Sequence, residues 1–127
     1  ELGHQSALPR IAPEDMPYGI TGMEGANTTL VVVATNLGLN RGQAKRLAIM
    51  AQDGLARAIR PVHTPFDGDS VFALATGTSR DVPVTPLLLA AVGLLAADAA
   101  ARAIAKGVYH AQSLGDFPSY KEQFRLA

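Results

Sequence analysis

The pattern of apolar and polar positions divides the chain into two parts. Residues 1–27 contain proline and glycine at short intervals and show no apolar periodicity, which is typical of a loop or linker. From residue 28 onward, the pattern predicts strand, helix, strand, helix and a polar tail, in that order. We therefore interpret 1–27 as a linker and 28–127 as the folded region.

Two short apolar runs predict β-strands. Residues 28–35 are rich in Val, Thr and Leu, and residues 70–76 read Ser-Val-Phe-Ala-Leu-Ala-Thr. Apolar residues lie on both sides of each run, so we expect strands that are buried on both faces. Because an isolated strand pair is only marginally stable, we expect these strands to join a larger sheet whose other strands lie upstream or in another chain.

Two longer segments predict helices. Asn40 is a suitable N-cap for a helix over 41–59, which has one apolar face, and we expect an ion pair between Asp53 and Arg57 on its surface. Thr85 is a suitable N-cap for a second helix over 86–110. This second helix is rich in Ala and Leu, and its small residues favour close packing against a neighbouring element.

Composition narrows the class of protein. A chain of 127 residues with 48% apolar residues has the size and core of one α/β domain. Its 11 basic and 11 acidic side chains cancel, which argues against nucleic acid as a partner. The absence of cysteine excludes disulfides and thiolate chemistry, and fits a cytoplasmic protein.

Membrane insertion and secretion are not indicated. The longest apolar run, 86–97, is shorter than the roughly 20 residues that span a bilayer. The first residues lack the basic and apolar regions of a signal peptide, and they read as the continuation of a longer chain. We expect a protein that contacts neither membrane nor nucleic acid.

The junction between Asn27 and Thr28 lies where the linker meets the first predicted strand. A cut there would give Thr28 a free amine beside its hydroxyl, so that one residue supplies both nucleophile and base. Gly22, Gly25 and Ala26 would let the backbone adopt the geometry that such a cut requires. The dipeptide is also consistent with Thr28 being simply the first residue of a strand.

A second candidate is the sequence Asp67-Gly68-Asp69, just before the second predicted strand. Side chains at i and i+2 of an extended segment point to the same side, so the two carboxylates could together orient an amine or hydroxyl. The same residues are also common in a simple turn. They lack the ligand run and closing Glu of a calcium loop.

The remaining polar residues give no cofactor or metal motif. His4, His63 and His110 lie far apart without ligand spacing, and the glycines form neither a Walker nor a Rossmann pattern. We therefore expect no cofactor and no metal. His63 is the one histidine of interest, because it lies four residues before Asp67.

Three blocks together resemble a known family. They are Asn-Thr-Thr-Leu-Val-Val-Val-Ala-Thr-Asn at 27–36, Gln-Ala-Lys-Arg-Leu-Ala at 43–48, and His-Thr-Pro-Phe-Asp-Gly-Asp-Ser-Val-Phe-Ala-Leu-Ala-Thr-Gly at 63–77. Over residues 20–110 the chain is similar to the self-cleaving N-terminal-nucleophile hydrolases of peptidase family S58. These include the D-aminopeptidase DmpA, the β-peptidyl aminopeptidases and the endo-type 6-aminohexanoate (nylon) oligomer hydrolase.

The resemblance implies a layered α/β sandwich, a precursor that cuts itself into α and β subunits, and a homotetramer or larger ring. On the match, the cut is Asn27/Thr28, Thr28 is the nucleophile, and Asp67 and Asp69 support it. The Thr-Asp-Asp set resembles the nylon-oligomer branch, since the aminopeptidase branch has Ser and Glu at the aspartate positions. The family's oxyanion-stabilising residues lie in the α part, of which the linker would be the last segment.

The expected function is therefore a self-processing amide hydrolase that acts on short peptides or 6-aminohexanoate-type oligomers. One alternative is an acyltransferase like the ornithine acetyltransferases, which also use a self-generated N-terminal Thr. Another is a non-catalytic scaffold subunit in which Thr28 only begins a strand.

Overall fold

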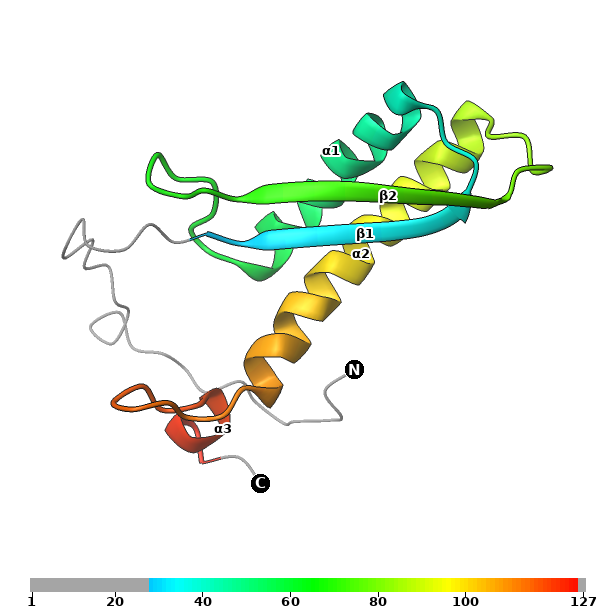
Figure 1. Cartoon of the computed structure of the whole chain (residues 1–127). Helices are drawn as coiled ribbons and strands as arrows, with labels where there is room; N and C mark the ends of the chain where they lie inside the picture. The colour runs from blue at the N-terminus through cyan, green and yellow to red at the C-terminus, as the bar shows by residue number, and fades with distance from the viewer. Residues whose placement is uncertain (1–27, 126–127) are drawn as a thin grey trace.

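The computed structural model describes residues 28–125. The elements are β1 (Leu30–Leu37), α1 (Arg41–Ala58), β2 (Ser70–Ser79), α2 (Pro86–His110) and the short α3 (Tyr120–Gln123). The two strands lie side by side, and α1 and α2 cross each other on one side of them (Figure 1). The order and type of the four main elements agree with the sequence prediction, and the fold is mixed α/β.

β1 and β2 are parallel, with α1 as the crossover between them. Leu30 pairs with Ser70, and the register continues to Thr35 opposite Ala75 before an irregularity near Leu37. Parallel strands require a long connection of this kind because they begin at the same edge of the sheet. The consequence is that the residues just before β1 and just before β2 are neighbours.

Both helices begin with the caps that the sequence predicts. The Asn40 side chain accepts a hydrogen bond from the Gln43 backbone N–H, and the Gln43 side chain accepts one from the Asn40 N–H, each at 2.9 Å. This capping box satisfies two backbone donors that have no partner within the helix. At α2, Thr85 accepts from the Leu88 N–H at 3.2 Å, with Pro86 at the first helical position.

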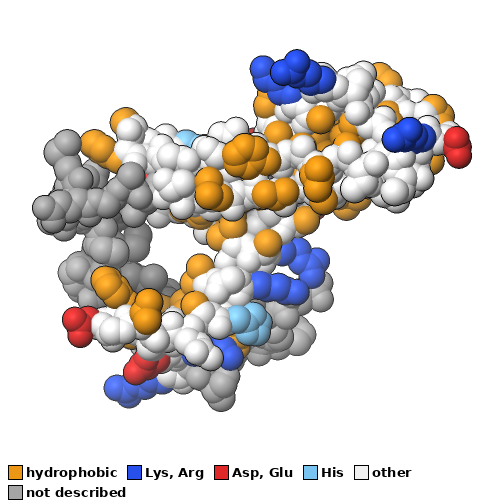
Figure 2. Space-filling model, viewed as in Figure 1, with side chains coloured by type: hydrophobic (Ala, Val, Ile, Leu, Met, Phe, Trp, Pro, Cys, Tyr) orange, Lys and Arg blue, Asp and Glu red, His pale blue; other side chains and the backbone are white. Residues whose placement is uncertain are grey.

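The two faces of the sheet differ in exposure. Side chains that point toward the helices are partly buried, whereas on the other face Leu30, Val32, Phe72 and Leu74 are 69%, 66%, 58% and 55% exposed. Figure 2 shows hydrophobic side chains gathered over the two strands on this face. Within residues 28–125 the helices cover one face of the sheet, and burial of the other face by an upstream segment or another chain stays a prediction.

The densest part of the structure is the crossing of α1 and α2. Leu47, Ala51 and Leu55 of α1 are buried, as are Ala97 and Ala100 of α2. Gly54 lies at the crossing: a methyl group there would collide with the Ala97 carbonyl oxygen and lie 2.8 Å from Ala100 Cβ. Glycine is required at this position because the two backbones approach closely.

The surface of α1 carries a different ion pair from the expected one. Arg57 pairs with Asp98 of α2 rather than with Asp53 of its own helix, so the prediction of an Asp53–Arg57 pair is wrong. The pair between helices forms because the crossing brings α2 within reach of Arg57. Both side chains are about half exposed, so the pair contributes at most about 1 kcal/mol.

Of the described residues, α2 is long and apolar enough to cross a membrane, judged by length and composition alone. Core helices of globular proteins pass the same test. In this chain the α2 face that carries Gly93, Ala97 and Ala100 packs on α1.

The glycine at the helix crossing can be tested by matched substitutions. We expect Gly54→Ala to lower the free energy of unfolding by about 1–3 kcal/mol, because the added methyl group overpacks the crossing. Gly107→Ala is the control: nothing lies within 4 Å of the added methyl group, and removing a helix glycine should stabilise by about 0.5–1 kcal/mol. Urea unfolding of the full-length protein measures both changes, and equal stability of the two variants would contradict the close approach.

Candidate active site

Thr28 lies beside the loop that precedes β2. A methyl group placed on Gly68 would lie 2.6 Å from Thr28 Oγ1, so the hydroxyl is packed against the glycine backbone. The parallel register places these residues together, since the Ser70 N–H donates to the Thr29 carbonyl oxygen at 3.0 Å at the beginning of the pairing. Two sequence candidates that lie forty residues apart therefore belong to one site.

The Asp69 side chain is well enclosed, with 7% of it exposed, against 32% for His63. Its Oδ1 accepts a hydrogen bond from the Thr29 backbone N–H at 2.9 Å, and its Oδ2 lies 2.8 Å from His63 Nδ1. The Thr29 amide is the main cause that lowers the pKa of the Asp69 carboxyl below its ordinary value of 3.8. Burial opposes this effect on the pKa, and the hydrogen bonds from His63 add to it.

Asp67 has different partners from Asp69. Its Oδ2 accepts from the Thr64 backbone N–H at 2.7 Å, and its own N–H donates to the Thr64 carbonyl oxygen at 3.0 Å. These two bonds close a turn, which is the simple structural role that an Asp-Gly sequence also predicts. In the structure, the described hydrogen bonds link Asp69 to β1, whereas those of Asp67 stay within its own loop. The catalytic role of Asp67 stays a prediction.

His63 joins the site through a backbone conformation that few residues adopt. Its φ of 56° lies in the left-handed region, where His is more frequent than most residues other than glycine. The ring lies between the Asp69 carboxylate and Gln52 of α1, with 3.3 Å between His63 Nε2 and Gln52 Nε2. The sequence indicated His63 through its spacing from Asp67 and as the first residue of the third block that resembles the family. It gave no sign of Gln52, which reaches the loop only after α1 has packed.

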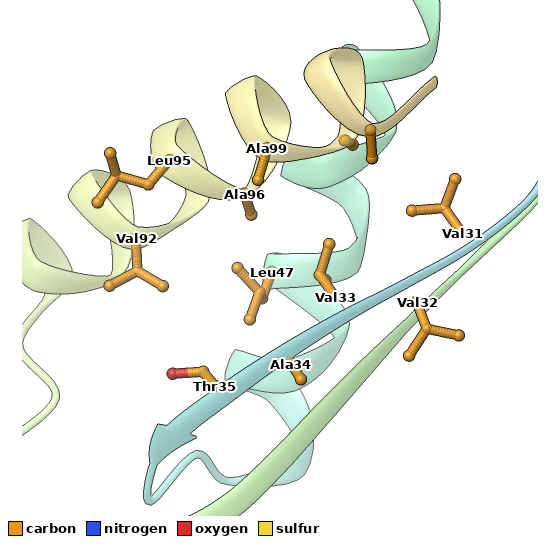
Figure 3. Close-up of a pocket in the computed structure, with 12 residues that line it drawn as sticks. Val31, Val32, Val33, Ala34, Thr35, Leu47, Val92, Leu95, Ala96 and Ala99 are labelled. Carbon is orange, nitrogen blue, oxygen red and sulfur yellow. The ribbon is translucent and has the colours of Figure 1, made fainter. Parts of the chain in front are cut away.

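Other parts of the described chain are poor candidates for chemistry. Residues 28–125 contain no group of three His, Asp or Glu side chains that could hold a metal ion. A pocket between β1 and the helices is lined by aliphatic side chains, including Val33, Leu47 and Val92, with Thr35 as the polar exception (Figure 3). Asn27, the other residue of the predicted cut, lies outside the described residues.

The arrangement suits a reaction that begins at Thr28. Thr28 is an exposed residue, and its hydroxyl oxygen lies against Gly68. A charged carboxylate fixes the amide of the next residue, so the backbone around the hydroxyl is held in place. A threonine hydroxyl still needs a base before it becomes a good nucleophile.

Comparison with known families decides which family the chain belongs to. A sequence profile described as peptidase family S58 matches residues 3–120. The chain belongs to peptidase family S58. The match covers both the Thr28 junction and the His63–Asp69 loop, and it confirms the resemblance that the sequence blocks indicated.

The chain is also similar to named members of this group. It is 46% identical over 107 residues to an uncharacterized aminopeptidase of Mycobacterium tuberculosis. The matched region covers 77% of this chain and 31% of the relative. A similar aminopeptidase of Mycobacterium leprae is 45% identical over 111 residues, covering 80% of the chain and 31% of the relative. A 6-aminohexanoate-oligomer endohydrolase of Paenarthrobacter ureafaciens is 35% identical over 63 residues, covering 50% and 18%.

The chain spans about a third of the length of the curated aminopeptidases that it matches. Experiments that test the site therefore use the full-length protein.

The Asp69 carboxylate gives a prediction for acid stability. Because its pKa is lower in the folded protein, the stabilisation is complete above pH 3.8 and is lost as the pH falls through the lowered folded value. We expect Asp69→Asn to be less stable than the parent at about pH 7, with the difference shrinking below about pH 4.

Urea unfolding of the full-length protein at a series of pH values measures the difference in stability. Asp53→Asn, at an exposed position on α1, is the control and should show a flat difference across the series. If Asp69→Asn lowers the free energy of unfolding by the same amount at every pH, the result would contradict a carboxylate whose charged form is stabilised by its amide and imidazole donors.

Proposed function

We propose that the protein is a self-processing amide hydrolase whose nucleophile is Thr28, released by a cut between Asn27 and Thr28. The observation that carries the proposal is the contact of Thr28 Oγ1 with Gly68, next to a carboxylate bonded to the Thr29 amide. Membership of peptidase family S58 and relatives named as aminopeptidases and an oligomer endohydrolase support amide hydrolysis.

Processing would begin with attack of the Thr28 hydroxyl oxygen on the Asn27 carbonyl carbon. The peptide bond between the two residues breaks as the acyl group moves to the oxygen, and the nitrogen becomes the free amine of Thr28. Water then hydrolyses the ester, which leaves a carboxylate on Asn27 and restores the Thr28 hydroxyl. The product is a chain that begins with a nucleophile and a base on the same residue.

Catalysis would reuse the same atoms on an external amide. The Thr28 amine accepts the hydroxyl proton, directly or through one water, and the oxygen attacks the substrate carbonyl. The leaving amine takes the proton, and water releases the acid from the acyl-enzyme. Asp69 keeps its charge through the pH range of such a reaction because its pKa is lowered, so it can orient the adjacent backbone and the new ammonium group.

Two substrate classes fit this site. The Thr28, Asp67 and Asp69 set resembles the branch that cleaves 6-aminohexanoate oligomers, whereas the two mycobacterial relatives, which have higher identity, are named aminopeptidases. We therefore propose short peptides or linear amide oligomers as substrates, with the amide carbonyl as the common reacting group.

The open face of the sheet supports the rest of the proposal. Leu30, Val32, Phe72 and Leu74 form an apolar surface that water-exposed sheets rarely carry. We propose that the upstream α part of the same precursor covers it and completes a layered α/β sandwich. A cytoplasmic homo-oligomer, for example a tetramer, is the proposed assembly.

The nucleophile is tested by two substitutions at one position. In the full-length protein, Thr28→Ala should remain a single uncut chain with amidase activity reduced at least about 1,000-fold, because the attacking oxygen is gone. Thr28→Ser keeps a hydroxyl and should still be cut. Denaturing gels and hydrolysis of an aminoacyl anilide measure both effects, and a cut, active Thr28→Ala protein would exclude Thr28 as the nucleophile.

The contact between Thr28 and Gly68 gives an independent prediction. Gly68→Ala places a methyl group 2.6 Å from the unshifted Thr28 Oγ1, so the hydroxyl must move and processing should slow at least about tenfold. Gly107→Ala, which meets no atom within 4 Å, should be processed at the parent rate. Denaturing gels of samples taken at intervals after protein synthesis measure the processing rate. Processing of Gly68→Ala at the parent rate would show that this contact does not position the hydroxyl.

A further inference from the structure

We propose that His63 is a positioning residue of this site, whose imidazole holds the Asp69 carboxylate in the orientation that fixes the backbone beside Thr28. The inference rests on the proposed function, because it concerns how the nucleophilic Thr28 hydroxyl is oriented. It is carried by a continuous series of contacts that begins on α1 and ends at the first residues before β1.

The series has three links. Gln52 of α1 contacts His63 Nε2 at 3.3 Å, His63 Nδ1 contacts Asp69 Oδ2 at 2.8 Å, and Asp69 Oδ1 accepts from the Thr29 N–H at 2.9 Å. Each link joins a different part of the fold: α1, the loop before β2, and the start of β1. A shift of the imidazole would therefore be transmitted through the carboxylate to the residue that follows Thr28.

The hydrogen-bonding capacities of the groups fix the ring orientation. A charged carboxylate only accepts hydrogen bonds, so His63 Nδ1 must carry the hydrogen that faces Asp69. In the neutral ring Nε2 is then an acceptor, and the Gln52 amide group facing it is a donor. The contacts on both nitrogens therefore agree with one tautomer.

Asp69 depends on these donors because little of it is in contact with water. Its side chain is 7% exposed, Oδ1 accepts from the Thr29 N–H, and His63 Nδ1 faces Oδ2, while the His63 backbone and the Thr29 side chain contribute further hydrogen bonds. Removing the imidazole leaves Oδ2 without that donor, and an enclosed carboxylate then turns toward solvent or another donor. Either movement disturbs the bond from Oδ1 to the Thr29 amide.

The backbone of His63 supports a specific role for this side chain. Its φ of 56° is disfavoured for most residues with a side chain, and it directs the ring toward Asp69. No described contact joins the imidazole to Thr28, so His63 acts through Asp69 rather than on the reacting atoms.

The pH dependence follows from the groups that face Asp69. They are His63 from its own loop and the uncharged Thr29 amide just before β1; α1 contributes the neutral Gln52 amide to the ring. The hydrogen bond from the His63 imidazole lowers the pKa of Asp69, so its loss should raise that pKa, while the hydrogen bond from the His63 backbone remains. The acid limb of the stability profile, measured by urea unfolding over a pH series, should then move to higher pH.

The test compares two substitutions at His63 in the full-length protein. Asparagine keeps a side-chain N–H near the place of Nδ1 and tolerates positive φ, whereas alanine has no donor. We expect His63→Ala to lower kcat at least about tenfold with KM changed less than about threefold, to slow processing, and to move the acid limb upward. His63→Asn should recover most of the lost rate and the position of the acid limb.

A control variant and two outcomes make the test decisive. His110→Ala, at the end of α2, should match the parent in kcat and pH profile. Parent-like kcat and acid limb in His63→Ala would overturn the proposal, as would a folded His63→Asn as impaired as His63→Ala. If His63→Ala does not fold, a folded His63→Asn that loses rate at least tenfold also overturns it.

Thr28→Ala on the same protein separates the two proposals. A cut and active Thr28→Ala protein defeats the proposed function itself. An uncut, inactive Thr28→Ala protein together with a parent-like His63→Ala protein defeats only the positioning role.

Discussion

The hydrogen bond from the Thr29 amide to Asp69 is the interaction on which the site depends. It ties the beginning of β1 to the loop before β2, forty residues away in sequence. The parallel register makes the bond possible because both strands begin at the same edge of the sheet. Without this bond Thr28 would only precede a strand; with it, the Thr28 hydroxyl has a fixed place against Gly68.

The helix layer supports this arrangement from behind. The crossing at Gly54 lets α1 and α2 pack as one layer, and α1 brings Gln52 to the His63 ring. The site therefore joins the loop before β2 to the residues that precede β1, and α1 supports the loop through Gln52.

The sequence predicted the local features of the fold well. Asn40 and Thr85 cap helices as expected, since a cap depends on a few adjacent residues. Prediction from the sequence failed where a feature depends on tertiary contacts. Arg57 pairs with Asp98 rather than with Asp53, because only the helix crossing brings Asp98 near. The described residues cover one face of the apolar strands, so burial of the second face stays a prediction.

The candidate site was predictable in part for the same reason. Thr28 and Asp69 were identified from sequence blocks, and the structure brings them to one edge of the sheet. Asp67 was paired with Asp69 on the assumption of an extended segment, but its carboxylate closes a turn with Thr64. His63 and Gln52 could not be assigned from spacing, because their contacts exist only when α1 lies on the loop.

The central claim is that the bond between Asn27 and Thr28 is cut and that Thr28 begins the catalytic chain. N-terminal sequencing of the purified, active full-length protein, combined with its intact mass, tests this claim most directly. The account predicts two chains, one of which begins with Thr28-Thr29-Leu30. A fully active protein that consists of a single uncut chain would contradict it.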